Sequence, residues 1–146
     1  MSVAMERDVI RTRGKVLVVA ATAVLAWVGL WVHNAADLAG QTPLSPESSG
    51  PGLVSVVLIA LWFLPRSRRF AGWLLLGWAS LNLIGGAILS VLPLPILPFA
   101  PEQSLRHYLF HLLYGACQVP LIAVLVVNLR RRRGATEWSR TQPSRR

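Results

Sequence analysis

Residues 16–36, VLVVAATAVLAWVGLWVHNAA, form a run of 21 amino acids without a charged side chain. As an α-helix, a run of this length measures about 30 Å, which is the thickness of the hydrocarbon core of a membrane. Residues 70–92 form a second such run, of 23 amino acids. These two runs predict transmembrane helices, and they place the chain among the all-α integral membrane proteins.

The composition favours the same class. Of 146 residues, 53% are hydrophobic and only 14% are charged, whereas soluble domains carry roughly 25% charged residues. The net charge of +9 would suit a nucleic-acid binder, but the basic residues stand in blocks beside the apolar runs, where they set topology and contact anionic headgroups. We therefore expect a lipid bilayer as partner and no nucleic acid. The use of fourteen Arg to one Lys suggests a bacterial source.

We predict a single transmembrane domain over residues 16–130 and no soluble domain. Its second helix is the weakest, because the strictly apolar core covers only residues 53–64 and needs flanking residues to reach membrane length. Residues 1–15 are expected to be a basic cytoplasmic arm, and residues 131–146 a basic cytoplasmic tail that is disordered. The four spans are expected at about residues 16–36, 51–66, 70–92 and 104–129.

The first span also resembles a secretory signal peptide. A basic start and an apolar run precede small residues at positions 35–36 and 39–40, where cleavage is typical. The apolar run is long for a signal peptide, however, and it contains Trp27 and Trp31. We therefore expect a retained helix.

The distribution of basic residues favours one orientation. With four spans and both termini in the cytoplasm, fourteen of the fifteen Lys and Arg residues are cytoplasmic and only Arg106 is outside. Positive residues collect on the cytoplasmic side of membrane proteins. The sequence thus predicts a multi-pass protein of the plasma (inner) membrane with cytoplasmic N- and C-termini.

Five side chains that can bind a metal are expected at the outer ends of the first and fourth spans: His33, Asp37, Glu102, His107 and His111. The first two, and the last two, are four residues apart, so each pair can share a helix face. Imidazole and carboxylate together suit Zn, Cu, Ni or non-haem Fe, and two facing imidazoles suit haem. Both hypotheses require the first and fourth helices to be neighbours. Otherwise the histidines, like the tyrosines and tryptophans of the chain, are amphipathic side chains at the water–lipid boundary.

Tyr114 and Gln118 continue the histidine face of the fourth span towards the middle of the membrane. This polar stripe is explained either by hydrogen bonds between helices or by a polar path for a small solute. Pro120 lies in the same span and removes one backbone hydrogen bond, which predicts a kink at residues 115–120.

Residues suited to helix packing stand in the third span. Gly85, Gly86 and Ser90 are small and allow close approach of a neighbouring helix. Asn82 should face another helix, because an amide exposed to lipid is costly. These residues also suit self-association of the chain.

Signatures of known chemistry are absent from the sequence. No span carries a charged residue at its middle, and there is no HExxH, GxSxG, CxxC or phosphate-binding loop. We therefore expect an accessory or self-associating membrane subunit more than an enzyme, with a membrane-protein partner or a second copy as its target. The alternatives are a metal- or haem-binding protein and a small-solute pathway along the fourth helix.

The orientation can be tested with reporters that are active only outside the cytoplasm. Inserted at Glu47, such a reporter should be active; fused after Arg146, it should be inactive, because fourteen basic residues hold that side in the cytoplasm. The reverse pattern would mean that the bundle is inserted the other way round.

Overall fold

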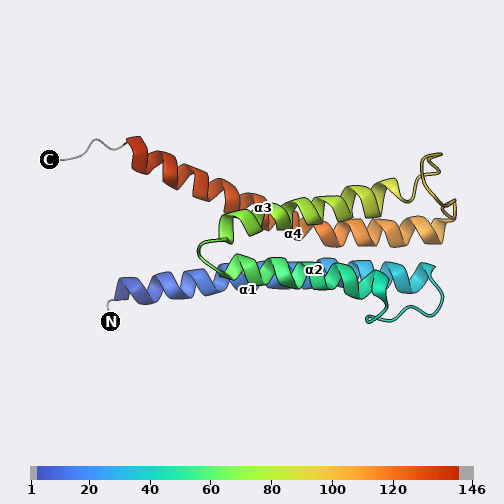
Figure 1. Cartoon of the computed structure of the whole chain (residues 1–146), viewed down its shortest axis with the longest axis horizontal. Coiled ribbons are helices and arrows are strands. Elements are labelled where there is room, and N and C mark those ends of the chain that lie inside the picture. The colour runs from blue at the N-terminus through green and yellow to red at the C-terminus, as the bar shows by residue number, and fades with distance from the viewer. Residues whose placement is uncertain (1–2, 142–146) are drawn as a thin grey trace.

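The computed structural model describes residues 3–141, which form a bundle of helices with no strand in this range (Figure 1). Among the described residues, four helical segments are long and apolar enough to cross a membrane, namely Gly14–Asp37, Pro46–Phe63, Arg68–Leu89 and Leu105–Arg131. The predicted all-α class, with four helices that are able to span a membrane, is therefore confirmed. The elements are α1 (Val3–Asp37), α2 (Pro46–Phe63), α3 (Arg68–Leu81), the π-helix η1 (Asn82–Leu89) and α4 (Leu105–Thr141).

Consecutive helices run in opposite directions along the long axis of the molecule. Figure 1 shows both termini at one end of the bundle and the α1–α2 and α3–α4 connections at the other end. We call these the terminal end and the loop end. The predicted metal-binding side chains belong to the loop end, because α1 finishes and α4 begins there.

The core lies where α1 and α4 pack along each other. Small side chains recur every three or four residues on the buried face of α1, at Val19, Ala23 and Ala26. They meet Leu121 and Leu125 of α4, and both helices pack against residues of α2 and α3. Without a hydrophobic effect between helices in lipid, such small residues favour association because they let backbones approach.

The helices α1 and α4 approach each other closely at Gly29. A Cβ atom at this position would lie 2.5 Å from the Cβ atom of Cys117, which is closer than two carbons can come. A side chain at position 29 would therefore push the two helices apart.

The π-helix η1 continues α3 without a break. The backbone N–H of Ser90 donates to the carbonyl of Gly85, five residues earlier, at 3.1 Å, and the Ser90 hydroxyl donates to the carbonyl of Gly86. Because the hydrogen bonds of a π-helix span five residues instead of four, the carbonyls left unpaired at its end differ from those of an α-helix. Such segments are frequent at functional sites.

Both terminal helices are longer than predicted. The basic arm forms the start of α1, and α4 continues as a helix to Thr141 in place of the disordered tail expected from residue 131. Arg is a good helix former, and one glycine at position 134 costs only about 1 kcal/mol. Residues 142–146 lie outside the described residues. Pro120 lies inside α4 without ending it, and Figure 1 shows the red C-terminal part of α4 at an angle to its orange part.

Replacing Gly29 by alanine should lower the free energy of unfolding by about 1–3 kcal/mol, because the new methyl group overpacks the contact between α1 and α4. The measurement is thermal or denaturant unfolding of the purified chain in detergent. Gly77→Ala is the matched control, since no atom lies within 4 Å of its added Cβ. The cost should vanish in a Cys117→Gly background; an equal cost there would contradict the proposed clash.

Candidate metal centre

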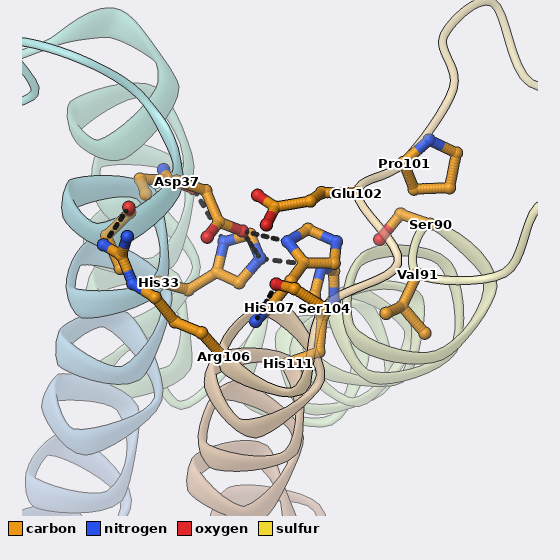
Figure 2. A network of polar contacts seen from close by, with 12 residues as sticks. His33, Asp37, Ser90, Val91, Pro101, Glu102, Ser104, Arg106, His107 and His111 are labelled. Carbon is orange, nitrogen blue, oxygen red and sulfur yellow. Dashed lines mark hydrogen bonds and ion pairs between the residues drawn. The ribbon is translucent and has the colours of Figure 1, made fainter.

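The structure brings α1 and α4 together at the loop end, which the sequence could not establish. His33 on α1 and His111 on α4 face each other, with their Nε2 atoms 2.9 Å apart (Figure 2). Their rings meet edge to face, with centroids 4.2 Å apart. The two imidazoles thus meet across the interface between the first and last helices.

Asp37 lies between two of the imidazoles. Its Oδ2 atom is 3.2 Å from Nε2 of His33 and 2.8 Å from Nδ1 of His107. Despite these short distances, Oδ2 is buried and has no aligned hydrogen-bond donor. Both nitrogens therefore approach the oxygen away from the direction of a hydrogen bond. The carboxylate oxygen is therefore left without a hydrogen bond beside the two rings.

The backbone of η1 fixes the orientation of His111. Nδ1 of His111 lies 3.1 Å from the carbonyl oxygen of Ala87. Ala87 is in the last turn of the π-helix, where a carbonyl needs a partner from outside the helix. Because a carbonyl can only accept, Nδ1 carries the hydrogen. In the neutral ring, Nε2 is then free to bind a cation, and it points at His33.

The side chain of Asn34 fixes the orientation of the His33 ring. Its Nδ2 atom donates to the carbonyl of Glu47 and to Oγ of Ser48, both at 3.1 Å. Its Oδ1 atom is therefore directed to Nδ1 of His33, at 3.2 Å, and accepts the hydrogen of that nitrogen. Sequence reasoning missed Asn34, although it is a buried amide next to a histidine inside a transmembrane run. A polar neighbour that fixes the ring is typical of metal-binding histidines.

Three electron-pair donors therefore converge on one place. Nε2 of His33, Nε2 of His111 and a carboxylate oxygen of Asp37 all lie within 4.8 Å of one another. Ligands about 2.0–2.1 Å from one metal ion lie about 2.9–3.4 Å apart for bond angles of 90–110°. The observed separations of 2.9 and 3.2 Å fall in this range. Lone pairs held this close repel each other unless a positive charge lies among them.

The other two predicted ligands take different places. His107 joins the cluster through Asp37 and through its ring, whose centroid lies 4.4 Å from that of His111. Its Nε2 atom is buried and has no hydrogen-bond partner. Glu102 is exposed at the rim, and Figure 2 shows its carboxylate facing His107 and Asp37. Glu102 is not among the three converging ligands.

A cleft of about 370 Å³ opens directly onto the cluster. One wall consists of the histidines and Asp37; the other includes Phe99 and Pro101 from the proline-rich α3–α4 connection, and Ser90 at the end of η1. The side chains of the cluster therefore line a cleft at the surface of the bundle.

Arg106 ties the two helices together beside the cluster. Its guanidinium donates to the carbonyl of Ala36 at 2.8 Å, near the C-terminal end of α1. Cations at this end of a helix are favourable, since carbonyls are unpaired there. The sequence marked Arg106 only as the lone basic residue on its side, and its partner comes from the fold.

The deeper residues of the polar stripe are bonded within the bundle. The Tyr114 hydroxyl donates to Oδ1 of Asn82 on η1 at 2.6 Å, and Nε2 of Gln118 donates to the carbonyl of Ala26 on α1 at 3.1 Å. A Cβ on Gly86 would lie 2.8 Å from the Tyr114 oxygen. The cavity beside Asn82 and Gln118 has only about 10 Å³, so these groups hold helices together at this depth.

Tyr114→Phe should lower the free energy of unfolding by about 0.5–2 kcal/mol, because it leaves the Asn82 oxygen without its donor in apolar surroundings. The measurement is unfolding in detergent. Tyr108→Phe is the matched control, since the Tyr108 hydroxyl bonds Gln103 in an exposed position. Equal effects of the two substitutions would show that the buried hydrogen bond contributes nothing beyond the loss of a hydroxyl.

Comparison with known proteins adds no family to this description. No protein-family model matches the chain, and neither a curated protein nor a solved structure matches it. A bundle of apolar helices hosts many functions, so architecture alone does not assign one. The role of the chain has to be argued from the side chains at the loop end.

Proposed function

We propose that this chain is a membrane protein that binds one first-row transition-metal ion at the loop end of its bundle. The convergence of Nε2 of His33, Nε2 of His111 and a carboxylate oxygen of Asp37 carries the proposal. His33 and His111 would each bind through the nitrogen that their backbone and amide partners leave without a hydrogen. Asp37 would supply a negative charge that offsets part of the charge of the ion.

The ligand set limits the choice of metal. Two imidazoles and one carboxylate suit Zn²⁺, Fe²⁺, Ni²⁺ or Cu²⁺, whereas a site for Cu⁺ would use thiolates or thioethers. Three protein ligands leave at least one position open, as in sites that bind water or substrate. Here the open position would face the cleft of about 370 Å³, so that an external ligand completes the coordination shell.

Haem is supported less well than a single ion. Two axial imidazoles bind iron from opposite faces of the porphyrin, each about 2 Å from the iron, so their nitrogens lie about 4 Å apart with the macrocycle between them. Nε2 of His33 and Nε2 of His111 are only 2.9 Å apart. A porphyrin plane does not fit between the two rings without separating α1 from α4.

The other two functions expected from the sequence have less support. For self-association through the third helix, the small residue Gly86 is not available, because it faces Tyr114 within the bundle. A solute path along α4 would need a cavity past Gln118, where only about 10 Å³ is open. For localisation, we propose the plasma membrane with cytoplasmic termini, which places the metal ion at the outer surface; the basic residues near the terminal end support this orientation.

Metal binding can be measured directly on the full chain, purified in detergent with an affinity tag free of histidine. After incubation with Zn²⁺ or Co²⁺ and removal of the excess, elemental analysis should give about one ion per chain. His33→Ala and His111→Ala should each abolish this binding. Asn34→Ala should weaken it by about 10–100-fold, because the His33 ring loses its orienting partner. Binding should also weaken as the solution is made more acidic, because protons compete with the metal ion for the imidazole nitrogens.

Glu102→Gln is the matched control, because it removes a carboxylate charge at the same end without touching the three converging atoms. It should retain the full amount of metal. A wild-type chain that takes up no metal would contradict the proposal.

A further inference from the structure

A second groove lies at the opposite end of the bundle, between α1 and α4. It has a volume of about 410 Å³, and its walls include Gly14, Val18, Val124 and Val127. A Cβ on Gly14 would meet no atom within 4 Å. The missing side chain at position 14 and the short valines therefore leave a hollow along the surface between the two helices.

Two cations stand at the mouth of this groove. Lys15 from α1 and Arg131 from α4 are both lining residues, and both side chains are exposed. Within the part of the chain whose contacts are described, neither forms an ion pair with a carboxylate. Past these cations the wall becomes apolar, with Val18 and Val127 about half exposed.

The groove thus combines a cationic mouth with an apolar floor. The first candidate membrane span begins at Gly14, and the last one ends at Arg131. In a bilayer, the mouth of the groove would therefore lie at the depth of the lipid headgroups and its floor at the depth of the acyl chains. Basic pockets between transmembrane helices are suited to anionic headgroups. An apolar floor that continues into the membrane suits an attached acyl chain.

We propose that this groove binds one anionic phospholipid, with its phosphate between Lys15 and Arg131 and an acyl chain along Val18, Val124 and Val127. This site is independent of the metal centre, which lies at the other end of the same helix pair. The lipid would cover the apolar surface left open between α1 and α4.

The test uses the full chain in detergent, titrated with phosphatidylglycerol or with phosphatidylcholine of the same acyl chains, and reads lipid binding by native mass spectrometry and thermal unfolding. Phosphatidylglycerol should bind more tightly and raise the unfolding temperature more. The double substitution Lys15→Ala with Arg131→Ala should reduce its affinity on the order of 30-fold, which corresponds to two surface cations.

Arg66→Ala with Arg69→Ala is the matched control. It removes the same charge from two exposed residues, Arg66 in the α2–α3 connection and Arg69 in the first turn of α3. Figure 1 shows this connection near the terminal end. It should leave the lipid affinity within a factor of about three. Gly14→Leu should fill the groove and weaken binding of both lipids without lowering the stability of the lipid-free chain.

Three results would overturn the proposal. Equal affinity for phosphatidylglycerol and phosphatidylcholine would show that Lys15 and Arg131 do not recognise the anionic headgroup. Equal losses in the two double variants would mean that the general surface charge attracts the lipid, with no site between α1 and α4. Stabilisation by glycerophosphate equal to that by phosphatidylglycerol would mean that the apolar floor is not used.

Discussion

The close contact of α1 and α4 at Gly29 is the constraint on which the rest of the structure depends. Gly29 precedes His33 by one helical turn and Asp37 by two, so all three share one face of α1. A side chain at position 29 would meet Cys117 at 2.5 Å and separate the helices. The 2.9 Å approach of the two imidazoles just beyond it therefore depends on a residue that has no side chain.

The buried face of α4 changes character along its length. Towards the loop end it carries His107, His111, Tyr114 and Gln118; towards the terminal end it continues as Leu121, Leu125 and Leu129. The polar part is tolerated because backbone carbonyls of α1 and η1, and the Asn82 amide, accept hydrogen bonds from it. The same helix face thus builds a polar cluster at one end and an ordinary apolar core at the other.

The class of fold could be predicted because lengths of uncharged sequence translate directly into membrane spans, as residues 16–36 and 70–92 illustrate. The polar face of the fourth helix followed from helical periodicity in the same way. The pairing of α1 with α4 could not be predicted, because it depends on how Gly29 fits against Cys117, which lies 88 positions further along the chain. The roles of Asn34, Arg106 and Ala87 also come from contacts between elements. The π-helix η1 leaves no periodic signal that distinguishes it from the end of an α-helix.

The 2.9 Å contact of His33 with His111 joins positions 78 residues apart. During synthesis, the first helix enters the membrane long before the fourth exists, so the site cannot form until the last span is in place. Closing a loop of this length in the disordered chain has an entropic cost that grows only slowly with length. An ion held there would act as a cross-link between α1, which is synthesised first, and α4, which is synthesised last. Such a cross-link would form only in a completely assembled bundle.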